Sequence, residues 1–152
     1  LGGSGGLPRV VIDYAHTPDA LEKVLASLRE HVRGDLICVF GCGGDRDRGK
    51  RPMMGAVVRR LADRVVLTDD NPRHEDGSSI IEQILAGMGD DAGVTVERDR
   101  ARAIAGAVAC AGSDDLVLVA GKGHEDCQLV GDLKLPFSDR EQVDKAFAEY
   151  QR

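Results

Sequence analysis

The chain has 152 residues, of which 42% are hydrophobic and 30% charged, and its formal net charge is −6. This length and composition predict one domain that is large enough to bury most of its apolar surface. The negative charge and the few aromatic residues (three Phe, two Tyr and no Trp) argue against a nucleic-acid surface of basic patches and stacking rings. No apolar run approaches the roughly 20 residues of a transmembrane helix and no signal segment opens the chain, so we expect no membrane contact and a cytoplasmic protein.

Strands and helices alternate along the chain. Residues 1–7 are rich in glycine and predict a flexible linker or a cloning remnant, followed by a single domain over residues 8–152. Apolar, β-branched runs predict strands at residues 9–13, 36–40, 64–68, 94–97 and 115–120. Helical periodicity and end signals predict helices at residues 18–32, 52–61, 79–89, 99–111 and 138–150.

Local end signals support these boundaries. Thr17 predicts an N-cap before Pro18, and the pairs Ser79 with Glu82 and Ser138 with Glu141 predict capping boxes. Residues 128–130 and 133–135 predict a hairpin around a two-residue Gly-Asp turn. The alternation predicts an α/β fold, a three-layer, doubly wound, Rossmann-like domain with a mainly parallel sheet and an antiparallel edge hairpin.

The cysteines are scattered along the chain without a C-x-x-C pair. They are Cys38, Cys42, Cys110 and Cys127. Three of them lie in or beside predicted apolar elements, which favours buried, reduced thiols over a disulfide framework or a metal site. We therefore assign no metal to them.

Four predicted strands end in chemically dense loops, at residues 13–17, 41–50, 69–73 and 121–125. The carboxyl ends of parallel strands meet at one edge of a sheet, where open α/β sheets bind ligands. In the third loop, Asp69 or Asp70 could face an ammonium group and Arg73 a carboxylate, because its planar fork donates two parallel hydrogen bonds. The alternative interpretation is a charged surface turn.

The second loop resembles a P-loop until Arg51, which stands where the Ser or Thr that binds magnesium would be. Its glycines and basic residues beside a helix N-terminus still predict an anion site. The basic residues are Arg46, Arg48, Lys50 and Arg51. The alternative is a solvated basic turn neutralised by Asp45 and Asp47.

The first and fourth loops offer further polar groups. Glu125 could complete a cage for an ammonium group, whereas His124 is a ligand or merely a packed residue. Asp13 could accept hydrogen bonds from ribose hydroxyls and His16 could approach a phosphate. The alternative is that Tyr14 belongs to the core and that Thr17 only caps a helix.

Four motifs, at residues 13–19, 41–52, 70–73 and 121–125, closely resemble the C-terminal domain of the Mur ligases in their order and spacing. The resemblance implies an ATP-dependent ligase of peptidoglycan synthesis in the cytoplasm. Such a ligase joins an amino acid to UDP-N-acetylmuramoyl-L-alanyl-D-glutamate through an acyl phosphate. The Asp-Asn-Pro-Arg motif at residues 70–73 implies that the amino acid is meso-diaminopimelate and not L-lysine.

The resemblance also implies residue roles. The residues implied to contact meso-diaminopimelate are Arg46, Asp70, Asn71, Pro72, Arg73, Gly121 and Glu125. Asp13 and His16 match positions near the nucleotide, and no residue is implied to be catalytic or to bind a metal. The chain would position the amine and close over the acyl phosphate.

The family's P-loop, the Mg²⁺ ligands and most of the UDP-substrate site belong to other ligase domains. ATP and Mg²⁺ would therefore bind mainly outside this chain, and we expect the fragment alone to be inactive. A rival hypothesis is a non-catalytic module that binds diaminopimelate or a nucleotide. Arg51 argues against an independent P-loop kinase, and the Asp-Asn-Pro-Arg motif argues against a folylpolyglutamate synthase, which shares the fold.

Overall fold

The computed structural model describes residues 1–89 and 93–150. Five parallel strands form its main sheet, in the order β1-β5-β2-β3-β4. The strands are β1 (Arg9–Asp13), β2 (Leu36–Phe40), β3 (Arg64–Leu67), β4 (Val94–Val96) and β5 (Leu116–Ala120). The helices are α1 (Pro18–Arg29), α2 (Lys50–Leu61), α3 (Gly77–Ala86), α4 (Arg100–Cys110) and α5 (Asp139–Tyr150). The doubly wound α/β fold is thus confirmed.

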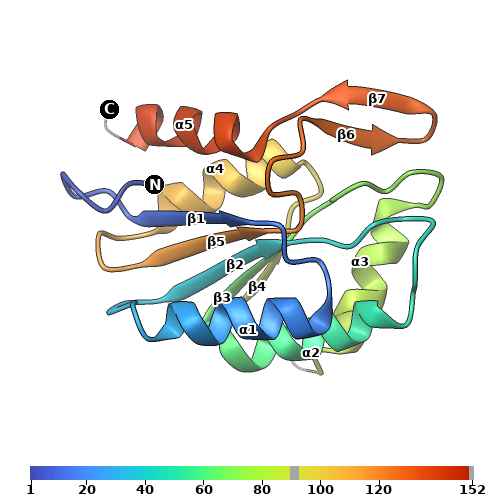
Figure 1. The fold of residues 1–152 in the computed structure, drawn as a ribbon, viewed down its shortest axis with the longest axis horizontal. Helices are drawn as coiled ribbons and strands as arrows, with labels where there is room; N and C mark the ends of the chain where they lie inside the picture. Colours follow the sequence, from blue (N-terminus) through green and yellow to red (C-terminus); the bar gives the residue numbers. More distant parts are fainter. Residues whose placement is uncertain (90–92, 151–152) are drawn as a thin grey trace.

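Helices cover both faces of the sheet (Figure 1). Helices α1, α2 and α3 pack side by side on one face, and α4 and α5 pack together on the other. Every residue of β2 and β5 is buried, because these two strands lie inside the sheet and have helices on both sides. This double burial explains why their sequences are continuous apolar runs without alternation.

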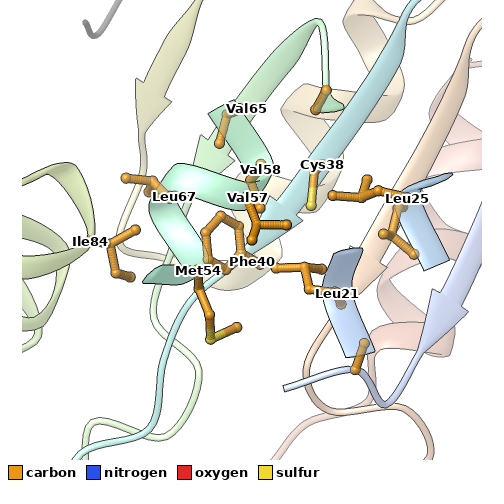
Figure 2. Close-up of a cluster of buried hydrophobic side chains, with 14 of the residues drawn as sticks. Leu21, Leu25, Cys38, Phe40, Met54, Val57, Val58, Val65, Leu67 and Ile84 are labelled. Carbon is orange, nitrogen blue, oxygen red and sulfur yellow. The ribbon is translucent and has the colours of Figure 1, made fainter. Parts of the chain in front are cut away.

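The larger core cluster lies between the sheet and α1–α3. Figure 2 shows Phe40 of β2 surrounded by aliphatic side chains from α1, α2, α3 and β3. Phe40 is fully buried, as are Leu21 and Leu25 of α1 and Ile84 of α3. Each such side chain contributes about 1.5–3 kcal/mol through burial. This packing fixes the ends of β2 and β3, from which the second and third loops emerge.

The antiparallel hairpin differs from its prediction. Strands β6 (Cys127–Val130) and β7 (Leu133–Pro136) form a separate two-stranded sheet and not an edge of the main sheet. The outer edge of β1 is partly covered by the chain's first residues, because Val10 N donates to Leu1 O and Gly2 pairs with Arg9. The hairpin lies instead beyond the carboxyl ends of the strands (Figure 1), where Val130 forms a bridge with Arg73. Its Gly-Asp turn is confirmed.

Most helix boundaries agree with the sequence, and the exceptions have local reasons. Helix α3 begins at Gly77 because Asp76 caps it by accepting from Ser78 N, so the capping box predicted at Ser79 is wrong. Helix α2 begins two residues before Pro52, whose missing N–H is tolerated in a first turn. The predicted caps at Thr17 and Ser138 are confirmed, since their side chains accept from Ala20 N and Glu141 N.

All four cysteines are free thiols, as predicted. Cys38 and Cys42 are buried, but Cys110 is exposed and Cys127 half-buried, so the prediction of burial is wrong for those two. Cys110 is the last residue of α4, where the helix reaches the surface. In residues 1–89 and 93–150, no helix is long and apolar enough to cross a membrane.

Strand order determines where a ligand can bind. The connection after β2 runs through α2 on one face of the sheet, whereas β5 follows α4 on the other face. Neighbouring strands whose connections cover opposite faces leave a crevice at their carboxyl ends. The β2–β5 boundary is such a switch point.

Candidate functional site

A polar pocket of about 270 Å³ lies at this switch point and is lined by all four predicted loops. Its lining residues are Tyr14, His16, Gly41, Cys42, Gly43, Arg46, Lys50, Asp70, Asn71, Arg73, Gly121 and Glu125. Six of the seven residues assigned to the amino acid are among them, and Pro72 is the exception. The pocket therefore brings three basic side chains and two carboxylates together.

A larger groove of about 540 Å³ lies between α4 and the β3–β4 side of the sheet. Its walls are mainly aliphatic, including Ile37, Val65 and Ala103, with Arg64, Glu97 and Arg102 as its charged residues. The polar pocket is the better candidate despite its smaller volume, because charges of both signs converge there from four loops.

Arg73 is held between the second loop (residues 41–50), called the glycine-rich loop below, and the hairpin. Its Nη1 donates to Gly44 O at 2.9 Å, its backbone N donates to Leu129 O, and its carbonyl accepts from Gly131 N. Its φ of +53° lies in the left-handed region, which costs a non-glycine residue on the order of 1 kcal/mol. The surrounding hydrogen bonds maintain this conformation, and the guanidinium lines the pocket.

The glycine-rich loop and the Asn-Pro-Arg segment are in direct backbone contact. Gly44 N donates to Asn71 O at 2.8 Å, and a Cβ at Gly44 would overlap the carbonyl of Pro72. Glycine is therefore required at position 44. Pro72 itself is buried and lies outside the pocket lining, so its contribution is to the shape of the loop.

The structure distinguishes the two adjacent aspartates. Asp69 pairs with Arg98 at 3.2 Å and lies outside the polar pocket. Asp70 is only 7% exposed and lines the pocket, where it packs against Gly121. A Cβ at Gly121 would overlap the Asp70 carboxylate, so this glycine makes room for it. Asp70 is therefore the carboxylate that can face an ammonium group.

Asn71 is oriented by two donors. Lys122 Nζ donates to its Oδ1 at 2.8 Å, and Leu129 N donates to the same oxygen at 2.9 Å. Since both partners are donors, the oxygen and nitrogen of the amide are assigned without ambiguity. A ligand contact of Asn71 would fall to its Nδ2 group.

Only part of the basic cluster in the second loop faces the pocket. Arg51 is fully buried and forms a two-pronged ion pair with Glu75, at 3.1 and 2.7 Å, and Arg48 joins the same carboxylate at 3.2 Å. The hydrogen bonds from Arg51 lower the pKa of Glu75 to about 2. The predicted four-residue anion site is therefore wrong in its membership: Arg46 and Lys50 line the pocket.

The outer rim of the pocket is formed by the first loop. His16 lines the pocket and its carbonyl accepts from Lys50 Nζ at 3.0 Å. Tyr14 is 56% exposed and stacks edge-on against His16, so it is not a core residue. Asp13 does not line the pocket, and its Oδ2 accepts from Ala15 N. His124 is exposed and also lies outside the pocket lining.

His74 connects the second loop to the hairpin turn, a link that nothing in the sequence indicated. Its Nδ1 lies 3.0 Å from Asp45 Oδ2 and its Nε2 lies 2.8 Å from Asp132 Oδ1. Hydrogen bonds to Asp132 and then Asp45 raise the pKa of His74. His74 thus links the hairpin turn to the loop that contains Arg46.

Two further buried cations lie behind the residues that line the pocket, and neither was assigned a role from the sequence. Lys122 is fully buried between two glycines at the end of β5. Arg100 is also fully buried and forms a two-pronged pair with Asp139, at 2.8 Å for both bonds. For Lys122 the available signal was a lysine between two glycines directly after a buried strand, whereas nothing local distinguished Arg100.

The pocket provides neither a nucleophile nor a metal site. Burial raises the pKa of the Cys42 thiol to about 12, so it is protonated at neutral pH. In the described part of the chain, no three His, Cys, Asp or Glu residues are grouped to hold a metal ion. The glycine-rich loop also does not fit a Mg²⁺-bound triphosphate, because Arg51 replaces the hydroxyl ligand and is already paired with Glu75.

Fold and pocket together define a class of protein: an α/β ligand-binding domain whose carboxyl-edge pocket suits a small molecule with both positive and negative groups. The model of the family described as "Mur ligase, glutamate ligase domain" matches residues 2–123. The chain belongs to this family, as its four motifs predicted.

Similar proteins are UDP-N-acetylmuramoyl-L-alanyl-D-glutamate--2,6-diaminopimelate ligases. The chain is 58% identical to that of Parasynechococcus marenigrum (strain WH8102) over 148 residues, which are 97% of this chain and 30% of the relative. It is 54% identical to that of Pseudomonas aeruginosa over 149 residues, which are 98% of this chain and 31% of the relative. The chain thus spans about 30% of the length of these relatives.

Solved structures agree with this assignment. A UDP-N-acetylmuramoyl-L-alanyl-D-glutamate--2,6-diaminopimelate ligase matches 94% of this chain and 30% of its own, with a TM-score of 0.89 and 43% identity. Escherichia coli FolC in complex with ADP matches 79% of this chain and 27% of its own, with a TM-score of 0.58 and 24% identity. The second match shows a shared fold only.

Proposed function

We propose that residues 8–152, after a connecting segment at residues 1–7, are the amino-acid-binding domain of an ATP-dependent ligase of peptidoglycan synthesis. This ligase adds meso-diaminopimelate to UDP-N-acetylmuramoyl-L-alanyl-D-glutamate. The observation that carries the proposal is the convergence of Arg46, Arg73, Asp70 and Glu125 on one pocket. Relatives named for this activity and 54–58% identical over nearly the whole chain support it.

The ligand's charges match those of the pocket. Diaminopimelate has two carboxylates and two amino groups, whereas L-lysine lacks one carboxylate. Arg46 and Arg73 suit the carboxylates, and Asp70 and Glu125 suit an ammonium group. The Nδ2 group of Asn71 would add a donor, Gly121 would allow close approach of the ligand, and Pro72 would fix the loop.

Arg73 provides discrimination against lysine. Its Nη1 is already bonded to Gly44 O, which fixes the guanidinium beside the pocket. Lysine would leave this half-buried cation without a carboxylate partner, and a missing polar partner is strongly penalised.

The chain's contribution to the reaction is positioning. The peptide carboxylate is activated by ATP as an acyl phosphate, and the amine held by this pocket attacks it. The pocket residues hold the amine and supply positive charge near the acyl phosphate when the domains close. Asp13 and His16 lie toward the nucleotide, while ATP, Mg²⁺ and the UDP substrate are bound mainly by the remaining ligase domains.

Two further properties belong to the same proposal. The isolated chain is inactive because its glycine-rich loop does not fit Mg²⁺-bound triphosphate. The ligase works in the cytoplasm, and the four free thiols support a reducing compartment.

The first test is calorimetric titration of the full-length ligase with meso-diaminopimelate and L-lysine, repeated with Arg73→Ala. We expect the unsubstituted protein to bind diaminopimelate at least tenfold more tightly than lysine, and the substitution to remove that difference. Equal binding of both amino acids before substitution would contradict the assignment of Arg73. A rival function, a binding module without chemistry, predicts no amino-acid-dependent phosphate release by the full-length protein.

A further inference from the structure

Lys122 is a fully buried lysine beneath the polar pocket. Its Nζ donates to Asn71 Oδ1 at 2.8 Å and lies 3.9 Å from Asp70 Oδ1 and 3.7 Å from Glu125 Oε1. All three partners line the pocket, but Lys122 does not. One ammonium therefore joins the loop after β3 to the loop after β5.

The two kinds of contact have different consequences. The 2.8 Å bond to Asn71 is a direct hydrogen bond, whereas 3.7–3.9 Å is ion-pair distance without a hydrogen bond. The single charge of Lys122 thus partly offsets the charges of Asp70 and Glu125, while their oxygens keep their capacity to accept from a ligand. Without a cation between them, two carboxylates drawn into one pocket would repel each other.

Asn71 depends on Lys122 in another way. Its Oδ1 accepts from Lys122 Nζ on one side and from Leu129 N on the other, and this pair of donors directs Nδ2 away from both. Loss of the lysine would remove one of the two donors, so that the amide could rotate.

We propose that Lys122 is a positioning residue for amino-acid binding. It orients the Asn71 amide and holds Asp70 and Glu125 together at the place that receives the ligand's ammonium group. The inference rests on the proposed function in that the ligand is an amino acid. Lys122 acts only through these three residues, because its own side chain is inaccessible.

The test is steady-state kinetics of the full-length ligase with Lys122→Met, which keeps a linear side chain and removes the charge. We expect the KM for diaminopimelate to rise at least tenfold, because misplacement by about 1 Å is costly to a bound geometry. The KM values for ATP and for the UDP-muramoyl dipeptide should stay within twofold. Ile104→Ala, a cavity variant in the buried core of α4, serves as the control for lost stability without a change at the pocket.

An unchanged KM for diaminopimelate in Lys122→Met would overturn the proposal, as would an equal rise in all three KM values. So would the same selective rise in Ile104→Ala, since it would indicate a general effect of stability. These outcomes leave the proposed function intact as long as the unsubstituted ligase uses diaminopimelate.

If the unsubstituted ligase uses neither diaminopimelate nor lysine, the proposed function fails and a crystal structure of this chain with Lys122→Met decides the role of Lys122. A rotated Asn71 amide and separated Asp70 and Glu125 carboxylates would support positioning. All three side chains in their original places would contradict it.

Discussion

At the scale of single residues, close backbone contacts decide the shape of the pocket. Position 44 admits only glycine, because a Cβ there would overlap the carbonyl of Pro72, which belongs to the segment that places Asn71 and Arg73. Position 106, in the middle of α4, has open space around it. The same substitution should therefore have opposite effects at the two glycines.

We expect Gly44→Ala to lower the free energy of unfolding by about 1–3 kcal/mol through steric overlap. Gly106→Ala should raise it by up to about 1 kcal/mol, since alanine favours the helix. Urea unfolding followed by circular dichroism measures both. Equal stabilities for the two variants would contradict the steric overlap at position 44. They would show that the glycine-rich loop can move away from Pro72 at little cost.

At the scale of elements, the buried Arg51 of α2 connects the glycine-rich loop (residues 41–50) to α3 and to the segment before it. It donates to Glu75, to Gln83 of α3 and to Gly43 O in the loop. One guanidinium thus connects three segments of the chain, and Arg51 is also the residue that excludes the P-loop interpretation. Since Arg51 is buried, its charge needs Glu75 to remain ionised.

This ion pair should produce a pH dependence of stability. The pKa of Glu75 is about 2 in the folded chain against an ordinary value of 4.5. The stabilisation is therefore complete above pH 4.5 and is lost as the pH falls toward 2. We expect Glu75→Gln to cost about 2 kcal/mol at pH 7.

The measurement is the difference in free energy of unfolding between unsubstituted protein and Glu75→Gln from pH 7 to pH 2. That difference should shrink toward pH 2, because Glu75 becomes protonated there. The other carboxylates titrate in both proteins, so their effects cancel in the difference. A difference that stays constant with pH would argue against an ionised Glu75 as the partner of Arg51.

At the scale of the whole molecule, Arg100 joins the α4–α5 helix layer to the sheet at the edge where the ligand would bind. Its guanidinium pairs with Asp139 at the start of α5 and also donates to Asp69 O and Ala120 O, at the ends of β3 and β5. Burial lowers the pKa of Arg100, but the hydrogen bonds and charge of Asp139 outweigh this effect and raise it overall. The pair fixes the positions from which Asp70 and Gly121 emerge.

Breaking this pair should be costly, whereas replacing it whole should not. We expect Asp139→Asn to lower the free energy of unfolding by about 3–5 kcal/mol, because it leaves Arg100 buried without its counter-charge. The double variant Arg100→Met with Asp139→Leu should recover most of that loss. Thermal unfolding of the three proteins measures the effect, and equal losses in the single and double variants would contradict it.

Much of the fold and site was predictable because the signals are local. The strand ends, the caps at Thr17 and Ser138 and the Gly-Asp turn depend on residues within a few positions of each other. The gathering of four loops followed from the rule that parallel strands end at one edge. Six of the seven residues carried over by motif line the observed pocket.

The sequence by itself determined the alternation of elements, the ligand-binding edge and the residue types of the pocket, since periodicity and loop chemistry are encoded locally. The motif resemblance already favoured Asp70 over Asp69, whereas only the tertiary structure paired Asp69 with Arg98, separated the hairpin from the main sheet and buried Lys122 and Arg51. Their partners lie far along the chain: Lys122 meets Asn71 across 51 positions, and Arg51 meets Glu75 across 24. A buried charge must find its partner in space, and no local pattern specifies which distant residue that is.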